Sequence, residues 1–518
     1  MRIFDPILSN AEAADFEKKF FDAGIRTQRE IIGEVGAKMA REFSAEFPAK
    51  RRLKLLAVLG SGHNAADALA FIAALAKSAQ MEIALVMPPA ERLKPLTREF
   101  FDALKKLPLE IIDCRRAAET RWNIAVEGLS GMSYAPPMRE KMREEIEMLN
   151  GIDADIKISV DIPAGLSDSP ADGDPIFCAD LTYATAIAKK CIFARENKKY
   201  CGRIRYIDTG FFGSPLGLGE SARSAAQKIA VPDALSILSR PRISNTDKRS
   251  YGKLLVVSGS QKYAGAAILN ASAAIRSGCG FVFSCIPEDF KPAFCTKEPS
   301  VIWHGCTVGD SGEIALENFT QINALAQNAT ALLCGSGLTN SRESAALVSE
   351  LLKANPALPC VLDADAITPE ILQCLNARKA PAVITPHEGE FLRIAPDASD
   401  ASLIDAARKY SATIVLKSNI TRICDGKSIA YSTRGSPALS RAGSGDILSA
   451  LIGGLLANES LKSAFSDKSQ MPQAICAMAA QWLGLAAEKA AAERSETALA
   501  TSDIINYLHA ALWTTTSI

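Results

Sequence analysis

Short, wholly apolar runs alternate with longer helical segments along most of the chain. The runs are apolar at successive positions, which is typical of strands buried on both faces of a parallel sheet. This pattern predicts an α/β fold in both halves of the chain. In the first half it predicts strands at residues 53–59, 82–86, 109–112, 123–126, 156–161 and 203–208. In the second half it predicts strands at residues 253–257, 281–285, 331–333, 360–362, 382–384, 413–416 and 429–431.

The alternating pattern breaks between residues 210 and 249, where glycine, serine, proline and isolated charges dominate. A chain of 518 residues is also too long to fold around one ordinary core. We therefore predict two α/β domains, residues 1–225 and the larger 226–518.

Composition narrows the class of protein. Lys+Arg and Asp+Glu are both 58, so there is no basic excess of the kind that nucleic-acid binders carry, and no nucleic-acid partner is expected. The longest apolar stretch, near residues 474–487, is interrupted by Gln481 and is too short for a membrane span. It predicts a buried helix and no membrane partner.

Cysteine and histidine usage gives no metal or disulfide pattern. The 13 cysteines include no C-x-x-C spacing, and the four histidines are widely dispersed, so a zinc cluster is not expected. The first residues lack the pattern of a signal peptide. Buried free thiols in a reducing cytoplasm are the expected state.

The strongest local motif is Ala442-Gly443-Ser444-Gly445-Asp446, which precedes an apolar helix. Glycines before a helix let its free N–H groups approach an anion, and the helix dipole favours negative charge there. An aspartate in the first turn can accept a proton from a hydroxyl beside a phosphoryl group. The alternative is a tight glycine turn followed by an ordinary N-terminal aspartate.

Polar residues and glycines also follow other predicted strands of the second half. They are Ser258-Gly259-Ser260, Tyr263 to Ala267, Gly335 to Leu338, Asp363 to Ala366, Thr385 to Glu390 and Lys417 to Thr421. The carboxyl ends of parallel strands meet at one edge of a sheet, where ligands bind. These segments therefore predict one site together with the glycine motif.

Taken in order, these motifs resemble those of the ADP/ATP-dependent NAD(P)H-hydrate dehydratases, which have a ribokinase-like fold. The resemblance spans residues 234–508 and implies phosphorylation of the hydrate hydroxyl followed by elimination. It implies that Asp446 is the catalytic base and, with Ala266, Gly337 and His387, binds the hydrate. The nucleotide would be held by Lys417, Ser418, Asn419, Ile420, Thr421, Gly443, Ser444 and Gly445.

Two of these assignments leave alternatives open. His387 could be a satisfied structural histidine, and Asp363 with Asp365 could either cap the next helix or help to position magnesium. Mg²⁺ is expected from phosphoryl-transfer chemistry in general. The chain departs from the family pattern at Asp247-Lys248-Arg249 and at Ser418, where glycine is usual.

The first half carries a second set of motifs: residues 60–68, residues 160–166, and Ala179-Asp180-Leu181-Thr182 with Lys189. They resemble the NAD(P)H-hydrate epimerases, which are Rossmann-like, three-layer proteins, over residues 15–212. The resemblance implies catalysis by Asp161 and Lys189. It implies that the hydrate is bound by His63, Asn64, Asp67 and Asp161, and that potassium is held by Asn64, Glu127 and Ala164.

This half departs further from its family. Ala65, Ala66 and Ala68 replace loop glycines and would remove the positive-φ option. The alternative is therefore a non-catalytic binding module fused to a dehydratase. For the second half, the alternative is a small-molecule kinase of the ribokinase type.

The leading interpretation is a member of the bifunctional NAD(P)H-hydrate repair family. ADP is the preferred donor over ATP, and a cytoplasmic homo-oligomer is expected.

Overall fold

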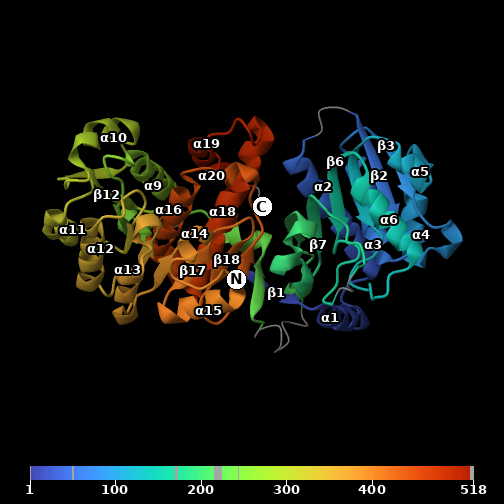
Figure 1. The fold of residues 1–518 in the computed structure, drawn as a ribbon, viewed down its shortest axis with the longest axis horizontal. Helices are drawn as coiled ribbons and strands as arrows, with labels where there is room; N and C mark the ends of the chain where they lie inside the picture. The colour runs from blue at the N-terminus through green and yellow to red at the C-terminus, as the bar shows by residue number, and fades with distance from the viewer. Residues whose placement is uncertain (1, 49–51, 170–172, 215–224, 243, 514–518) are drawn as a thin grey trace. The chain divides into compact units, whose positions relative to one another are not determined.

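The computed structural model describes residues 2–48, 52–169, 173–214, 225–242 and 244–513. The chain forms two compact units, Phe4–Val231 and Pro232–Ile518 (Figure 1). Strand β10 (Gln227–Ala230) lies after residue 225 yet pairs with β1 (Phe4–Leu8), which places it in the N-terminal unit.

The N-terminal unit is built on a parallel sheet. The strand order is β4–β3–β2–β5–β6–β7–β9, and every neighbouring pair is parallel. The strands are β2 (Leu53–Leu59), β3 (Met81–Val86), β4 (Leu109–Ile111), β5 (Trp122–Gly128), β6 (Ala154–Val160), β7 (Leu181–Thr185) and β9 (Arg203–Ile207). Strand β1 also pairs in parallel with β8 (Ala188–Lys189).

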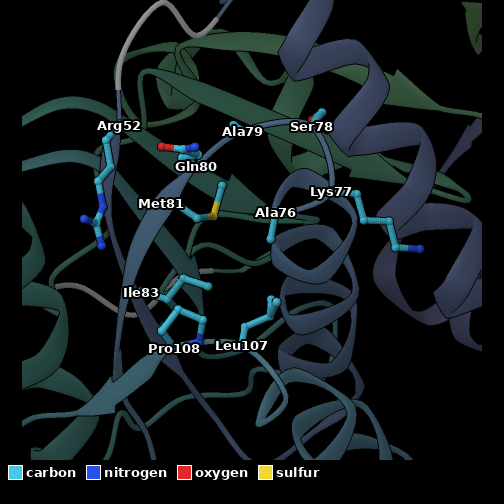
Figure 2. Close-up of a pocket in the computed structure, with 10 residues that line it drawn as sticks. All are labelled: Arg52, Ala76, Lys77, Ser78, Ala79, Gln80, Met81, Ile83, Leu107 and Pro108. Atoms are coloured by element: carbon cyan, nitrogen blue, oxygen red, sulfur yellow. The ribbon is translucent and has the colours of Figure 1, made fainter.

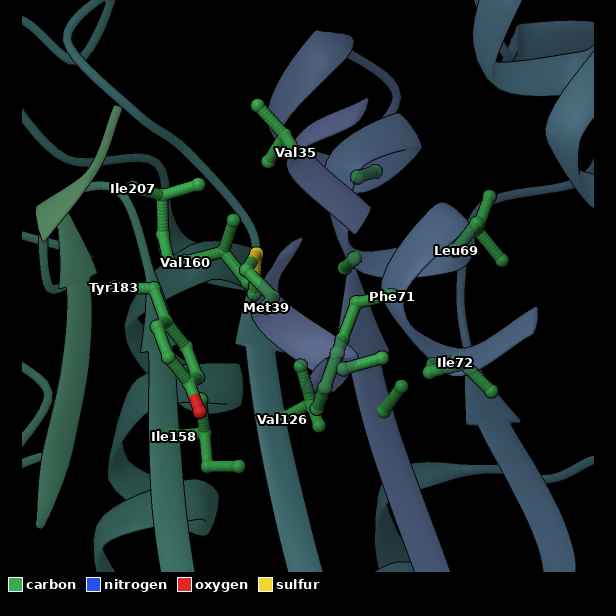
Figure 3. Close-up of a cluster of buried hydrophobic side chains, with 14 of the residues drawn as sticks. Val35, Met39, Leu69, Phe71, Ile72, Val126, Ile158, Val160, Tyr183 and Ile207 are labelled. Atoms are coloured by element: carbon green, nitrogen blue, oxygen red, sulfur yellow. The ribbon is translucent and has the colours of Figure 1, made fainter. Parts of the chain in front are cut away.

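Hydrophobic clusters cover both faces of this sheet. Successive residues of β2 belong to opposite clusters, so that Leu55 lies in one cluster and Leu56 in the other. The first cluster packs against α2 (Gln28–Glu46) and α3 (His63–Leu75), and Figure 3 shows part of it around Phe71. The second includes residues of α6 (Glu140–Gly151). The unit thus has three layers, and its other α-helices are α1 (Asn10–Asp22), α4 (Pro95–Leu104), α5 (Cys114–Ala118) and α7 (Lys198–Cys201).

The sheet of the C-terminal unit has the order β13–β12–β11–β14–β15–β16–β17–β18–β19. Pairs from β13 to β17 are parallel, whereas β17–β18 and β18–β19 are antiparallel. The strands are β11 (Lys253–Val257), β12 (Phe281–Pro287), β13 (Ile302–Cys306), β14 (Ala331–Cys334), β15 (Cys360–Leu362), β16 (Ala382–Ile384), β17 (Thr413–Leu416), β18 (Thr421–Cys424) and β19 (Ile429–Ser432).

Helix α16 (Ser444–Ala457) is the central helix of this unit. It contacts β11, β14 and β15 and packs between α9 (Ala264–Arg276) and α18 (Met471–Arg494), and it is buried from Ile447 onward. The remaining α-helices are α10 (Lys291–Lys297), α11 (Phe319–Ala326), α12 (Arg342–Ala354), α13 (Pro369–Gln373), α14 (Glu388–Phe391), α15 (Asp400–Lys409), α17 (Glu459–Ser463), α19 (Thr501–Ile505) and α20 (Leu508–Trp513).

The α/β class predicted from the apolar runs is confirmed in both units. Helix α18 is largely buried, as the apolar stretch near residues 474–487 predicted. Within the described ranges, no helix has the length and apolar character needed to cross a membrane. All 13 cysteines are free, but Cys178 and Cys295 are exposed rather than buried.

Candidate functional sites

The predicted glycine motif forms the start of α16. Gly443 is the N-cap residue at φ +93°, and no side chain caps the helix. A Cβ on Gly443 would lie 2.5 Å from Leu269 Cδ1, so this position requires glycine for both conformation and space. The first N–H groups of an α-helix have no intrahelical partner, although the Ser444 amide donates to the Arg441 carbonyl at 3.4 Å. Such amides at a helix N-terminus favour the approach of an anion.

Lys417, directly after β17, lies beside this helix start. Its Nζ donates to Asp363 Oδ1 at 3.0 Å, lies 3.8 Å from Glu390 Oε2, and is 3.0 Å from where a Cβ on Gly445 would be. Burial lowers the pKa of Lys417, but Asp363, Glu390 and Asp446 outweigh it and the pKa is raised overall. A positive charge therefore sits beside the start of α16.

Asp446 occupies the first turn of α16 and has the perturbed pKa expected of a base. Burial and the neighbouring Asp363 raise the pKa to about 7, whereas Lys417 and a hydrogen bond from Ser336 lower it. The main-chain carbonyl of Asp446 accepts a hydrogen bond from Asn270 Nδ2 at 2.7 Å. At neutral pH the carboxylate can thus take up a proton and release it.

Asp363 is the buried centre of this site. Its Oδ1 accepts from Thr385 Oγ1 at 2.7 Å and from Lys417, and its Oδ2 accepts from Ser336 Oγ at 3.0 Å. Its side chain makes no capping bond, so the capping alternative is wrong for Asp363. The next residue, Ala364, has φ +46°, a strained conformation of the kind found at functional sites.

The predicted hydrate-binding residues belong to the same unit. Gly337, at φ +68°, packs closely on Ala266 in the first turn of α9, because a Cβ on Gly337 would lie 2.9 Å from that of Ala266. His387 bridges to Lys417 through the main chain. Its Nδ1 accepts from the Glu390 amide at 3.2 Å, yet its side chain is 60% exposed. His387 therefore caps α14 and still presents its ring to solvent.

The turn between β17 and β18 carries the rest of the predicted nucleotide loop. Ser418 Oγ donates to the Ile420 carbonyl at 2.6 Å, and Ser418 does not adopt a positive φ. Serine in place of the usual glycine is thus accommodated without strain. Ser418 and Asn419 are exposed, and Thr421 is the first residue of β18. Ser444 Oγ donates to the Arg441 carbonyl at 3.0 Å.

The N-terminal unit has its own buried carboxylate and lysine. Asp161 directly follows β6 and has φ +71°, although it is not glycine. Its Oδ1 accepts from Lys189 Nζ and, at 3.2 Å, from Thr185 Oγ1. The Lys189 side chain is only 2% exposed. The structure therefore brings together the two residues predicted to transfer protons.

Two further carboxyls interact electrostatically with this pair. The pKa of Asp67 is raised well above its usual value by burial and by Asp161 and Glu17. Burial raises the pKa of Glu17, on α1, to about 7, and Lys189 lowers it. Glu17 was missed from the sequence, because one glutamate among the charges of an amphipathic helix carries no distinguishing signal.

His63 and Asn64 begin α3, whose N-cap residue, Gly62, also provides no side-chain cap. Both side-chain polar atoms of Asn64 are buried and lack a hydrogen-bond partner. A Cβ on Gly131 would lie 3.0 Å from Asp161 Oδ2 and 3.6 Å from Asn64 Oδ1, which places Asn64 near Asp161. Burial and the nearby Lys94 lower the pKa of His63, which favours the neutral ring.

The expectation that three alanines disturb the N-terminal loop is wrong. Helix α3 begins at His63, so Ala65, Ala66 and Ala68 are helical and need no positive φ. All three are fully buried in hydrophobic clusters. Their methyl groups fill the core of the unit.

The remaining predicted metal ligands, Glu127 and Ala164, already accept hydrogen bonds within the unit. Glu127 is buried and accepts hydrogen bonds from its surroundings, and burial raises its pKa to about 8. The Ala164 carbonyl accepts from the Phe177 amide at 2.9 Å.

A hollow of about 510 Å³ lies elsewhere in the N-terminal unit (Figure 2). It is lined near the starts of β2 and β3 by Arg52, Gln80 and Met81, and by Leu107 before β4. None of the predicted site residues lines it. Because those residues lie at the opposite ends of the strands, this hollow has no role in the proposed chemistry.

The fold is that of an α/β enzyme in which one unit holds a buried Asp161–Lys189 pair and the other holds Lys417 beside an uncapped helix start. A family model for NAD(P)H-hydrate dehydratase matches residues 254–510, and one for the YjeF-related protein N-terminus matches residues 29–191. The predicted combination of a Rossmann-like unit and a ribokinase-like unit agrees with these matches.

Curated relatives match the whole architecture. A bifunctional NAD(P)H-hydrate repair enzyme of Thermosynechococcus vestitus is 31% identical over 470 residues, covering 88% of this chain and 89% of the relative. Its counterpart from Gloeobacter violaceus is 31% identical over 474 residues, with 87% and 89% coverage. The chain belongs to the family of bifunctional NAD(P)H-hydrate repair enzymes.

Solved structures also align with part of the chain. A ribokinase-like superfamily protein from Enterococcus faecalis is 21% identical, with a TM-score of 0.48, and covers 57% of this chain and 98% of its own. An ADP/ATP-dependent NAD(P)H-hydrate dehydratase from Bacillus subtilis, co-crystallized with ATP/Mg²⁺, is 24% identical, with a TM-score of 0.45 and coverage of 55% and 98%.

Proposed function

We propose that this chain repairs hydrated nicotinamide cofactors at two sites. The C-terminal unit dehydrates the S form of NAD(P)H hydrate at the expense of ADP or ATP, and the N-terminal unit interconverts the R and S forms. The observation that carries the proposal is Asp446, a carboxyl with a pKa of about 7 in the first turn of an uncapped helix, beside Lys417. Relatives that are 31% identical are named bifunctional NAD(P)H-hydrate repair enzymes.

In the C-terminal site the hydrate hydroxyl attacks the terminal phosphorus of the nucleotide. Its proton passes to Asp446, and the bond between that phosphorus and the leaving nucleotide breaks. The amides of Gly445 and its neighbours, with Lys417, stabilise the charge on the transferred group. Departure of phosphate, with loss of a proton from the adjacent ring carbon, then restores the double bond.

Magnesium fits this site only through water and phosphate oxygens. Both oxygens of Asp363 already accept hydrogen bonds, and no group of three His, Cys, Asp or Glu side chains suited to a metal gathers anywhere in the described ranges. Mg²⁺ commonly keeps several waters and binds substrate phosphates. When bound with the nucleotide, it would neutralise phosphate charge.

In the N-terminal site Asp161 and Lys189 transfer the proton. Their contact places a base and an acid together in a buried site, where proton transfer is strongly favoured by fixed geometry. Asn64, with unpartnered amide atoms, and Asp67 and His63 bind the hydrate. The strained Asp161 backbone supports a functional rather than a structural role.

An absorbance assay for restored NADH tests the proposal directly. Purified protein is given the S hydrate with ADP, with ATP or without nucleotide, and turnover is expected only with a nucleotide, with ADP preferred. Sugar or vitamin phosphorylation without NADH recovery would instead support a ribokinase-type kinase.

Feeding the R hydrate separately tests the N-terminal unit. Consumption faster than spontaneous epimerisation is expected. A rate equal to the spontaneous one would leave this unit as a non-catalytic binding module. We further propose a cytoplasmic homo-oligomer, which cell fractionation and light scattering would check.

A further inference from the structure

Glu127 lies at the centre of the N-terminal sheet. It is the penultimate residue of β5, the middle strand of the parallel order, and it is aligned with Ser159 on β6. Its side chain is fully buried. It belongs to the set, with Asn64 and Ala164, that was expected to hold potassium.

The carboxyl of Glu127 is surrounded by hydrogen-bond donors. Its Oε1 accepts from the Leu129 amide at 2.7 Å, and its Oε2 accepts from Ser159 Oγ at 3.0 Å and from the Ala164 amide at 3.2 Å. The Ser130 amide also donates to it. These donors occupy both oxygens of the carboxyl and so leave less of it free to coordinate a cation.

The other two expected ligands do not complete a cation site. The Ala164 carbonyl already accepts from Phe177, and Ala164 has no side-chain oxygen. Of the expected ligands, Asn64 alone has a side-chain oxygen without a hydrogen-bond partner, and Ser130 Oγ in the loop after β5 is a second such oxygen. A potassium ion needs a ring of oxygens to replace its hydration shell. Two oxygens cannot supply that shell.

We infer that Glu127 takes the place of a bound cation in this unit, so that its carboxyl joins the end of β5, β6 and the loop at Ala164, and the N-terminal site works without potassium. The three segments carry or adjoin the residues of the epimerase site, since Asp161 follows β6. Glu127 is therefore a positioning residue. The inference rests on the proposed epimerisation only for its activity readout.

The first test uses the full-length wild-type protein. Its melting temperature is measured in potassium chloride and in choline chloride at equal ionic strength, and thallium(I) NMR serves as a direct probe for a potassium site. Equal melting temperatures, no thallium binding and an epimerisation rate that changes less than two-fold are expected. A thallium site, or a potassium-dependent rise in melting temperature, would overturn the inference.

The second test uses Glu127→Gln, which places an amide N–H₂ among the same donors. We expect the melting temperature of the N-terminal unit to fall by roughly 5 °C and epimerisation to fall more than ten-fold, while dehydration of the S hydrate continues. Glu145→Gln, which alters another buried glutamate on α6, is the matched control and should change neither rate. An unchanged melting temperature in Glu127→Gln would refute the role of Glu127 as a positioning residue.

If Glu127→Gln does not fold, the wild-type salt comparison still decides the question. If the wild-type protein does not epimerise the hydrate and its melting temperature does not depend on potassium, the result would count against the proposed function alone. A potassium response with normal epimerisation would count against the inference alone.

Discussion

The two units each place an aspartate directly after a parallel strand and pair it with a lysine, but they expose the pairs differently. Asp161–Lys189 is sealed, with lysine and aspartate side chains 2% and 7% exposed. Asp363–Lys417 leaves the lysine side chain 20% exposed, beside an uncapped helix. Both pairs lie at or next to a non-glycine residue with positive φ, Asp161 in one unit and Ala364 in the other.

The difference separates two uses of the same pair. In the proposed C-terminal mechanism Asp363 holds Lys417 and Ser336 in place while Asp446 carries the proton. In the proposed N-terminal mechanism Asp161 and Lys189 are themselves the acid and base, and Asp67 and Glu17 interact electrostatically with them. A sealed pair suits proton transfer, whereas an accessible lysine suits a phosphoryl group.

The largest expected effect is from Asp446→Asn, which removes the base of the C-terminal site only. Nucleotide-dependent dehydration should fall about 10²–10⁴-fold, the range for general-base catalysis. Epimerisation should persist, and the melting temperature above pH 7 should not fall, because a buried charge is removed. Near-normal NADH recovery would remove Asp446 from the mechanism.

Lys189→Met tests the sealed pair. It leaves Asp161 buried without its cation, which should cost about 3–5 kcal/mol of stability and abolish epimerisation. The double variant Asp161→Asn/Lys189→Met should regain stability by chemical denaturation but not activity. Lys190→Met is the control, because Lys190 is exposed and pairs with Glu12. Epimerisation by the double variant would show that the pair is structural.

The pH profile of dehydration distinguishes the two lysines. Asp446 must be deprotonated to act, so kcat/KM should rise as the pH increases through about 7. Lys417→Gln removes the cation that lowers the pKa of Asp446, which should move this rise to higher pH and weaken nucleotide binding. Lys189→Gln should leave the midpoint unchanged. An unshifted midpoint in Lys417→Gln would show that Lys417 does not lower the pKa of Asp446.

Gly445→Ala and Ser418→Gly should have the smallest effects. A Cβ at Gly445 would press on Lys417 Nζ at 3.0 Å, the flexible end of a side chain, so the KM for nucleotide should rise about ten-fold or less, near 1.4 kcal/mol. Ser418 already avoids positive φ, and Ser418→Gly should change KM less than two-fold. A large gain from Ser418→Gly would show that the serine restricts nucleotide approach.

Much of the fold could be predicted from the apolar runs. Strands β2, β11, β15, β16 and β17 match the predicted bounds, and the other predicted strands differ by a few residues at their ends. Strand β13 was missed because His304 and Gly305 interrupt its apolar pattern, and β18 because its first residue, Thr421, was assigned to a ligand loop. Strands such as β1 and β10 form only by pairing with distant partners.

The sequence by itself determined the alternation of strands and helices and the glycine that must begin α16, because apolar periodicity and positive φ are local properties. Only the tertiary structure decided which carboxyls act together. The pKa of Asp446 depends on burial and on Asp363, and Asp161, which follows β6, raises the pKa of Glu17 on α1. Electrostatic free energies depend on separation in space and on desolvation, and neither is encoded in the spacing of residues along the chain.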